Sequence, residues 1–353
     1  MSICTPTFNR RPFIPIMFEC FKNQTYPKNR MEWIIVDDGT DKISDLVASS
    51  NINQIKYVAV DNKLTLGKKR NLMHTYAKGS IIVYMDDDDY YPPERVAHAV
   101  EMLQANPQAM CAGSSEMYIY FKHINQMYQS GPFGPNHATA ATFAFRAELL
   151  KTARYMNSAA LAEERAFLKD YTIPFVQLDP MKTILVFSHN HNSFDKRKLL
   201  EHGESPVLKK SPKSVELFIR NAHEKPLFDF FMKDIDALLD NYEAGDPKNK
   251  PDVAQQMAEI DKKRKESGEG ASIMLQQPGK EPVRLGPEEI VRLLQQQQEH
   301  IEKLTWSLTN AENINQTLQS RNTVLERKLV ELNQPTNSEM IFDCKSKSDP
   351  EFF

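Results

Sequence analysis

The sequence predicts an α/β domain, with a mixed sheet between layers of helices, followed by a C-terminal coiled-coil helix. Three observations lead to this prediction. Short apolar runs rich in branched residues alternate with amphipathic stretches from residue 2 to about residue 112. Residues 244–286 are instead rich in charged residues, Gly and Pro. Apolar residues at seven-residue spacing then follow between residues 287 and 334.

Five apolar runs are expected to form strands, and the four stretches between them are expected to form covering helices. The expected strands are Ser2–Thr5, Trp33–Val36, Ile55–Val60, Ile81–Met85 and Ala109–Ala112. The expected helices are Pro12–Asn23, Lys42–Val47, Lys68–Lys78 and Pro93–Leu103. Four such crossovers favour parallel strands. Two β-like segments within Met117–Phe145 and a helix-like stretch at Glu148–Asp170 then indicate a mixed sheet.

Composition divides the chain into five regions. Residues 1–205 are expected to form the α/β domain, and residues 206–243, with apolar residues at helical spacing, a helical extension. Residues 244–286 contain too few apolar side chains to offset chain entropy, so we expect a mostly disordered linker. A coiled coil at 287–334 and a disordered tail at 335–353 complete the chain.

The heptad pattern predicts self-association of the C-terminal helix. Position a would hold Leu294, Ile301, Leu308, Asn315, Asn322 and Leu329, and position d would hold Ile290, Leu304, Leu318, Leu325 and Leu332. Asparagine at position a fixes register and favours two strands, so we expect a parallel homodimer. The alternative is a solvated single helix with coincidental leucines, because the run Gln295–Gln298 weakens one heptad.

Composition also excludes several classes of protein. The 353 residues are 41% hydrophobic and carry a net charge of −3, which gives no sign of a nucleic-acid partner. Four scattered cysteines without a C-x-x-C pair argue against a zinc site or a disulfide framework and favour a reducing compartment. No apolar run approaches the roughly 18 residues of a membrane span, and no signal-peptide pattern opens the chain. We therefore expect a soluble, unsecreted protein.

Four consecutive aspartates, Asp86–Asp89, follow the expected strand Ile81–Met85. Adjacent carboxylates at the end of a buried strand repel one another unless a cation lies among them. A hard ion, Mg²⁺ or Mn²⁺, bound to a diphosphate fits this oxygen-rich set. Open α/β sheets also bind their ligands at the carboxyl ends of their strands. The alternative is an acidic surface turn.

A second acidic pair, Asp37–Asp38, closes the expected strand Trp33–Val36 and precedes Gly39. Alone, Asp-Gly would indicate a turn. Two acidic strand ends on one edge of a sheet favour a shared site instead. A carboxylate there can accept a hydrogen bond from the imide N–H of uracil or thymine.

These motifs together resemble a known family. The segments Ile3–Arg10 (ICTPTFNR), Val36–Gly39, Gly67–Asn71 (GKKRN) and Asp86–Asp89 resemble, in order and spacing, inverting family 2 glycosyltransferases of the GT-A fold, over about residues 2–200. The resemblance implies a metal-dependent enzyme of the hexosyltransferase type. It would move a sugar from a nucleoside diphosphate sugar, most simply a UDP-sugar, to a hydroxyl or glycan acceptor. The chain also resembles glycosyltransferases of large DNA viruses, which implies the cytoplasm, host cytoplasm or a virion.

The resemblance assigns roles to residues at the sheet edge. It implies that Thr5, Pro6, Thr7 and Asp38 contact the nucleobase, with Asp37 beside them, and that Arg70 lies near the base or diphosphate. Asp86 and Asp88 would take the D-x-D positions, Asp86 towards the ribose and Asp88 on the metal. The run permits a shift of one residue, so Asp87 also counts among the donor-binding residues and Asp86 among the metal ligands. The alternative for Lys68–Arg70 is a solvated helix face.

A further set of residues would complete the site. Inverting transfer needs a carboxylate that takes the acceptor's proton, and the resemblance points to Glu163–Glu164. We expect Glu164 to be this base, although the family more often has Asp there and Glu163 remains an alternative. His189, and after it His191, would complete the metal shell, unless both are structural histidines.

The loop Gly131–His137 resembles the segment with which the family builds its acceptor site, or it is an ordinary surface connection. Two other functions remain open. A sugar nucleotidyltransferase would carry a glycine-rich loop after its first strand, and Thr5–Arg11 contains no glycine. A catalytically inactive coiled-coil scaffold would bind no nucleotide sugar.

Overall fold

The computed structural model describes residues 1–161, 163–201, 203–268, 273–275, 283–285 and 287–332. The chain divides into two compact units, Met1–Lys263 and Arg264–Phe353, and each is described by itself. The predicted tail, residues 335–353, lies outside the described residues. Within the described ranges, every helix is too short or too polar to cross a lipid bilayer.

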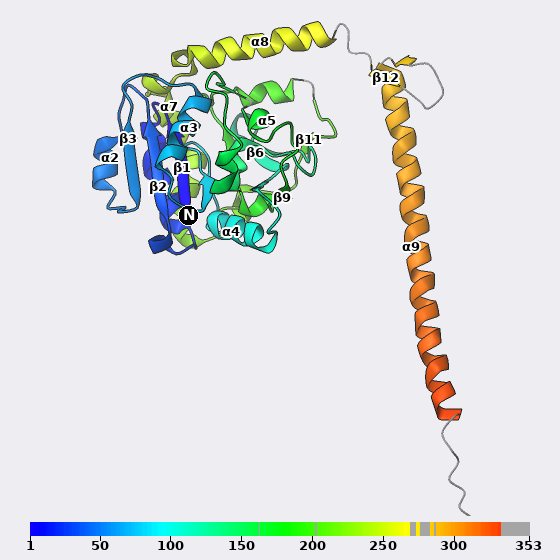
Figure 1. Ribbon diagram of the computed structural model, residues 1–353. Helices are drawn as coiled ribbons and strands as arrows, with labels where there is room; N and C mark the ends of the chain where they lie inside the picture. Colours follow the sequence, from blue (N-terminus) through cyan, green and yellow to red (C-terminus); the bar gives the residue numbers. More distant parts are fainter. Residues whose placement is uncertain (162, 202, 269–272, 276–282, 286, 333–353) are drawn as a thin grey trace, which may run out of the picture. The chain divides into compact units, whose positions relative to one another are not determined.

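The first unit is built on a seven-stranded sheet with the order β3-β2-β1-β4-β8-β5-β9 (Figure 1). Its parallel half comprises β1 (Ser2–Thr7), β2 (Glu32–Asp37), β3 (Ile55–Ala59) and β4 (Ile81–Tyr84). The interiors of β1, β2 and β4 are buried, as expected for parallel strands covered on both faces. Their carboxyl ends meet at one edge, where the predicted acidic motifs lie.

The other half of this sheet contains one strand, β8, that runs antiparallel to its neighbours. The strand β8 (Ala144–Arg146) runs antiparallel to both β4 and β5 (Cys111–Gly113), and β9 (Phe175–Gln177) is parallel to β5. The sheet is therefore mixed, as predicted, but β5 does not lie next to β4. Strand β8, which comes later in the sequence than β5, lies between β4 and β5.

Helices cover both faces of the sheet. On one face lie α1 (Ile14–Asn23), α2 (Ser44–Ser49) and α4 (Arg95–Ala105), which pack against alternate strand residues including Trp33. On the other lie α3 (Leu66–Tyr76) and α5 (Glu164–Phe167). The ring of Phe21 stacks on Trp33 with centroids 4.5 Å apart. Of the predicted helix Glu148–Asp170, only α5 and one short 3₁₀ helix (Ala147–Lys151) are helical.

A second, four-stranded sheet has the order β10-β6-β7-β11. It comprises β6 (Met117–Phe121), β7 (Gln126–Ser130), β10 (Leu185–Ser188) and β11 (Leu208–Lys210). The helical segments α6 (Lys225–Asp229), the π-helix η10 (Phe230–Asp234) and α7 (Ile235–Asp240) follow. Phe231 of η10 stacks on Phe187 of β10 at 4.3 Å between centroids, so these helices belong to the same core.

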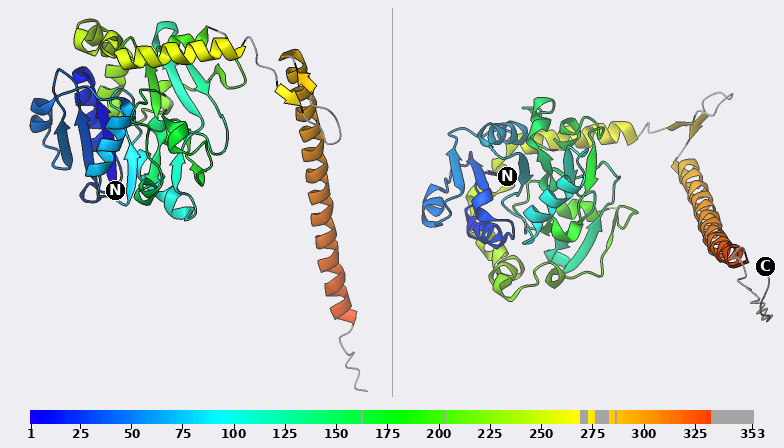
Figure 2. Two further views of the ribbon diagram at one scale, coloured as in Figure 1. Left: turned by 45° about the horizontal axis from the view of Figure 1, so that its top comes forward. Right: turned by 60° about the horizontal axis from the view of Figure 1, so that its bottom comes forward.

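The structure differs from the sequence-based expectation in residues 243–268. Instead of a disordered linker, the chain forms the 3₁₀ helices η11 (Glu243–Gly245) and η12 (Pro247–Asn249) and then α8 (Pro251–Gly268), drawn in yellow in Figure 2. The residues up to Lys263 belong to the first unit. Few of their side chains enter the core, and the segment is held by polar contacts, which hydrophobic composition does not reveal.

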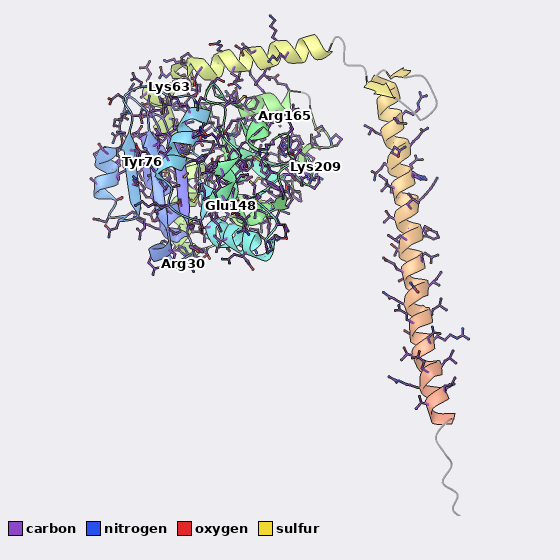
Figure 3. All side chains as sticks on the ribbon, in the orientation of Figure 1. Arg30, Lys63, Tyr76, Glu148, Arg165 and Lys209 are labelled. Carbon is purple, nitrogen blue, oxygen red and sulfur yellow. The ribbon has the colours of Figure 1, made fainter. Side chains whose placement is uncertain are left out.

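The second unit consists of the antiparallel pair β12 (Ile273–Leu275) and β13 (Val283–Leu285) and the helix α9 (Pro287–Leu332). The side chains described on α9 project into solvent around the helix (Figure 3). The predicted seam residues between 292 and 330 include Leu294, Ile301, Leu304, Leu308, Leu318, Leu325 and Leu329, and each is more than half exposed. The apolar stripe of α9 is thus uncovered in a single chain.

Candidate active site

A cavity lies at the carboxyl edge of the parallel strands, where open α/β sheets bind ligands. Its walls include Pro6, Arg10, Arg70 and the aspartates Asp86–Asp88. Its free volume of about 150 Å³ is below the roughly 300 Å³ at the lower end of ligand clefts. A nucleotide sugar can therefore bind there only if some of the covering side chains or segments shift.

The aspartate run follows β4 and is partly neutralised by arginines. Arg10 Nη2 donates to Asp88 Oδ2 at 3.1 Å, and Arg10 Nε lies 3.6 Å from Asp87 Oδ1. Burial and the charge of Asp88 raise the pKa of Asp89 well above its usual range. Although burial opposes it, Arg10 and His189 hold the pKa of Asp88 well below that range. Crowding of this kind favours an additional cation among the carboxylates.

Two of the predicted metal ligands lie together. The Nε2 atom of His189, just after β10, is 3.6 Å from Asp88 Oδ2. Burial lowers the pKa of His189 to about 4, so the ring is neutral. Metal binding through Nε2 requires the ring proton to lie on Nδ1, which here accepts a hydrogen bond from the His191 N–H, so this contact must rearrange. The buried Oδ1 atom of Asp86 has no hydrogen-bond partner among the described residues. In the same residues, no three His, Cys, Asp or Glu side chains gather closely enough to hold an ion alone.

This partial ligand set fits Mg²⁺ or Mn²⁺, which commonly use one or two carboxylates together with substrate phosphates. Asp88 and His189 can provide the protein's share. His191 lies differently: its backbone N–H donates to His189 Nδ1 at 3.2 Å, and its ring faces Tyr242, with centroids 6.4 Å apart. The structure thus brings His189, but not His191, against the aspartates.

Most residues predicted to contact the nucleobase already have partners inside the protein. Asp37 accepts hydrogen bonds from the Gly39 and Ile43 N–H groups and from the Tyr57 hydroxyl. Thr5 Oγ1 donates to the Met85 carbonyl at 2.6 Å and accepts from Trp33 Nε1 at 2.9 Å. The side chains of Asp37 and Thr5 therefore stabilise the ends of β1 and β2 through hydrogen bonds within the protein.

Asp38 is also engaged, because it pairs with Lys69 and accepts from the Leu64 N–H at 2.6 Å. A base would reach its carboxylate only by displacing one of these partners. Thr7 Oγ1, by contrast, is buried and has no hydrogen-bond partner among the described residues. Of the Thr5–Thr7 segment, Pro6 lines the cavity itself.

Arg70 connects the aspartates to the predicted catalytic glutamates. This buried side chain of α3 donates from Nε to Glu163 Oε1 at 2.9 Å, and its Nη2 lies 3.6 Å from Asp86 Oδ1. Its guanidinium also stacks over the Tyr84 ring at 4.3 Å. The Glu163 carboxylate is therefore held in place by its ion pair with Arg70.

Glu164 has a different environment from its neighbour. Burial, and then the negative charge of Glu163, raise the pKa of Glu164 to about 7. Burial and the negative charge of Glu164 also raise the pKa of Tyr171. The Tyr171 ring lies 5.0 Å from His137, whose ring is 4.9 Å from Phe133. The Tyr171 ring therefore lies beside the predicted acceptor loop Gly131–His137.

The turn that carries Tyr171 is strained. Lys169, Asp170 and Tyr171 have φ values of 50°, 54° and 63°, in the left-handed region that side chains other than glycine rarely adopt. Such strain is retained at sites where the surrounding structure fixes a side chain for function. Here the Tyr171 ring contacts His137 of the predicted acceptor loop.

Sequence reasoning gave no separate role to four cations of the cavity, Arg10, Lys63, Lys69 and Lys250. Arg10 belongs to the segment ICTPTFNR and Lys69 to the segment GKKRN, and neighbouring residues of both segments were predicted to bind the donor. Membership of these segments could therefore have identified both cations. Lys250 also lines the cavity, but it lies in the polar stretch that was expected to be disordered. Nothing in the local sequence distinguishes it from the exposed lysine Lys248 two residues before.

The chain is similar to known glycosyltransferases over its N-terminal part. Residues 2–165 match the model of the family described as Glycosyl transferase family 2. An uncharacterized glycosyltransferase of Haemophilus influenzae is 28% identical over 107 residues, which are 30% of this chain and 35% of that protein. The poly(ribitol-phosphate) beta-N-acetylglucosaminyltransferase TarS of Staphylococcus aureus is 29% identical over 105 residues, 29% of this chain and 18% of that protein. The matched part is thus about a third or a fifth of these relatives' lengths.

Two solved structures are also similar. S. aureus TarS 1-349 in complex with UDP-GlcNAc has a TM-score of 0.43 at 20% identity, covering 53% of this chain and 58% of that one. The mannosyltransferase PcManGT of Pyrobaculum calidifontis, in complex with GDP-Man and Mn²⁺, has a TM-score of 0.43 at 18% identity, covering 52% and 55%. The family match and the names of the sequence relatives support a family 2 glycosyltransferase domain and a transferase. With the mixed α/β architecture, they confirm the predicted GT-A fold.

Proposed function

We propose that this chain is a metal-dependent, inverting glycosyltransferase that moves a sugar from a nucleoside diphosphate sugar to a hydroxyl acceptor. One observation carries the proposal: Arg70 links Asp86 of the cavity to Glu163, the neighbour of the proposed base Glu164. The groups proposed to act on the donor and on the acceptor would therefore share one site. A UDP-sugar is the first donor to test, since TarS forms a complex with UDP-GlcNAc.

The donor would bind along the aspartate run. Asp88 and His189 would hold Mn²⁺ or Mg²⁺, with Asp86 towards the ribose, and this ion would neutralise charge on the departing diphosphate. Arg10, which now pairs with Asp88, is close enough to contact a phosphate oxygen once Asp88 binds a metal. Arg70 stays between Asp86 and Glu163 and so keeps the donor side and the acceptor side of the site aligned.

The acceptor would react beside Glu164. Its carboxylate takes the proton of the acceptor hydroxyl while that oxygen attacks the anomeric carbon opposite the diphosphate. The bond between the anomeric carbon and the diphosphate oxygen breaks with its electron pair going to the diphosphate. A pKa near 7 suits a general base at neutral pH. Glu163 is the alternative base, but its contact with Arg70 favours a positioning role.

The proposal is tested by measuring sugar transfer and donor hydrolysis with a panel of UDP-sugars, with Mn²⁺ and with EDTA. We expect EDTA to abolish the reaction, added Mn²⁺ to restore it, and Asp88→Ala to be inactive. Asp61→Ala, a change at an exposed aspartate, is the matched control and should retain full activity. Equal rates with EDTA, or an active Asp88→Ala protein, would exclude the metal-dependent mechanism. An inactive scaffold would also give no saturable heat when titrated with UDP-sugars and Mn²⁺.

We further propose that α9 pairs with a second copy of itself as a parallel coiled coil. The uncovered seam residues on α9 support this, because water-exposed leucines at positions a and d gain stability when a second helix covers them. Asn315 and Asn322 within the same seam favour a dimer. Sedimentation of the full chain measures the state directly, and a monomer at micromolar concentration would contradict the proposal.

A cytoplasmic location also stays a prediction. If the protein is viral, the predicted location is the host cytoplasm or a virion. Cys4, Cys20 and Cys111 are buried and unpaired, which suits a reducing compartment. Cell fractionation tests it, and recovery of the protein outside the cytoplasm or a virion would contradict it.

A further inference from the structure

Residues 242–256, called the strap below, pack over the cavity although their sequence resembles a linker. At its start, the Tyr242 hydroxyl donates to Asp41 Oδ2 at 2.8 Å. The Nδ2 atom of Asn9 donates to the Ala244 carbonyl at 2.9 Å. This contact ties the strap to the loop after β1 that carries Arg10.

The far end of the strap is fixed beside the predicted catalytic glutamates. Gln256 of α8 accepts hydrogen bonds from the Ala160 and Leu161 N–H groups at 2.6 and 3.2 Å, and donates to the Leu161 carbonyl at 2.9 Å. Asp252 pairs with Lys63, which Figure 3 labels. Because Ala160, Leu161 and Lys63 line the cavity, the strap is attached to the walls on both sides of it.

Lys250 is the residue of the strap that enters the cavity. Its side chain is buried, with 8% of the residue exposed, and its Nζ donates to Ser193 Oγ at 2.6 Å. Both residues line the cavity together with Asp87 and Asp88. The ammonium group therefore lies in the same space as the aspartate run.

The other cations lining this cavity are already paired with carboxylates. The pairs are Arg10 with Asp87 and Asp88, Lys63 with Asp252, Lys69 with Asp38, and Arg70 with Glu163 and Asp86. Lys250, in the part of the chain that the structure describes, has no carboxylate within the 4.0 Å that defines an ion pair. A buried cation without a counterion is unfavourable, and burial accordingly lowers the pKa of Lys250 to about 7. An anionic ligand would remove this penalty.

We propose that Lys250 binds the diphosphate of the donor and that the strap thereby forms one wall of the donor site. This inference rests on the proposed function. A lysine ammonium binds phosphate oxygens as a point charge, and Lys250 already points into the cavity that contains the aspartate run. The segment after the α/β domain is then part of the donor site as well as a connection to α9.

The test is the affinity of the full chain for a nucleoside diphosphate compared with its nucleoside, by calorimetry with Mn²⁺. The probes are UDP and uridine, or the corresponding pair where GDP, ADP or dTDP binds more tightly. We expect Lys250→Met to weaken nucleoside diphosphate binding by about 10-fold to 100-fold, because one charge-assisted contact is lost. Nucleoside affinity should change by less than about twofold. Lys248→Met, at an exposed lysine that pairs with Glu243, is the matched control and should leave both affinities unchanged.

Thermal unfolding separates ligand binding from a structural role. Without ligand, Lys250→Met should unfold at a higher temperature than the wild type, because an unpaired buried charge is removed. With the diphosphate and Mn²⁺, its stabilisation should be smaller than that of the wild type. An unchanged diphosphate-to-nucleoside affinity ratio in Lys250→Met would overturn the inference and leave the proposed function intact. A wild type that binds none of the four diphosphates would overturn both.

Discussion

The two adjacent glutamates should respond in opposite ways when each loses its charge. Glu164 is a half-buried carboxylate repelled by Glu163, whereas Glu163 is paired with Arg70. We therefore expect Glu164→Gln to be inactive but more stable than the wild type at pH 8. Glu163→Gln should be less stable and should keep a pH inflection from Glu164, shifted below pH 7 because the negative charge that raises the pKa of Glu164 is lost.

The magnitude for Glu164 follows from its pKa. A rise of the pKa from 4.5 to about 7 corresponds to at most about 3.4 kcal/mol, at about 1.36 kcal/mol per pKa unit. Partial exposure of the side chain reduces this to about 1–2 kcal/mol. The folded protein holds this proton more tightly than the unfolded chain, so its contribution to stability falls as pH rises from about 4.5 to 7. The gain in Glu164→Gln should thus be full at pH 8 and largely absent at pH 5.

Loss of the Glu163 charge leaves Arg70 buried with only the more distant Asp86. Breaking a buried ion pair costs about 3–5 kcal/mol, and the remaining Asp86 contact places the expected loss towards the lower value. At pH 8 this destabilisation is opposite in sign to the change expected for Glu164→Gln.

The assay combines thermal unfolding at both pH values with the pH dependence of kcat/KM. In the wild type, kcat/KM should rise about tenfold per pH unit below about 7 and level off above it, as Glu164 loses its proton. Comparing each variant with the wild type at the same pH cancels the other titrating groups. If Glu164→Gln kept more than about a tenth of the activity while Glu163→Gln lost the pH inflection altogether, Glu163 would be the base.

Two further predictions concern the strap and α9. Gly245→Ala would place its Cβ about 2.7 Å from His191 Nδ1 and 2.9 Å from the Asn9 carbonyl oxygen, so it should detach the strap. We expect a Tm lower by about 2–4 °C and a weaker affinity for UDP, and an unchanged affinity would show that the strap is not part of the site. Replacing both Asn315 and Asn322 by Leu should raise the stability of the α9 assembly and relax its preference for dimers. Sedimentation of the full chain measures this, and an unchanged dimer would mean that these asparagines do not fix the oligomeric state.

Much of the fold follows from local sequence, because buried parallel strands are continuous apolar runs. The runs at β1, β2 and β4 were recognisable for this reason, as were the acidic residues at the end of β2 and just after β4. The insertion of β8 between β4 and β5 was not recognisable, since strand order depends on contacts between residues far apart in sequence. The short strand has only three residues and little pattern of its own.

The site shows the same division. Asp88 and His189 were both predicted as metal ligands from separate motifs, and the structure brings them within 3.6 Å. The partners of Asp37 and Asp38 were not predictable, because backbone N–H groups carry no signature in sequence. Lys250 reaches the cavity through contacts such as the one between Asn9 and Ala244, made by ordinary polar residues 235 positions apart. Composition describes how much a segment can bury, but not which polar groups it can meet.

Arg10 gives the sharpest test of how charge is exchanged at this site. It pairs with Asp87 and Asp88 and so occupies the same carboxylates that a divalent ion would bind. Arg10→Gln removes this competing cation, so Mn²⁺ alone should bind about tenfold more tightly, a change of about 1.4 kcal/mol. Binding of UDP in the presence of saturating Mn²⁺ should instead weaken by about tenfold, because the arginine is then free to contact the diphosphate.

The matched control is Arg11→Gln, since Arg11 pairs with Asp41 and Asp45 away from the aspartate run. The affinity for Mn²⁺ alone and the affinity for UDP at saturating Mn²⁺ should both be unchanged in that variant. Calorimetry of Mn²⁺ alone and of UDP with Mn²⁺ measures the two effects of Arg10 separately. A weaker affinity of Arg10→Gln for Mn²⁺ alone would mean that Arg10 positions the aspartates for the ion. In that case the arginine would not exchange between carboxylate and phosphate during the reaction.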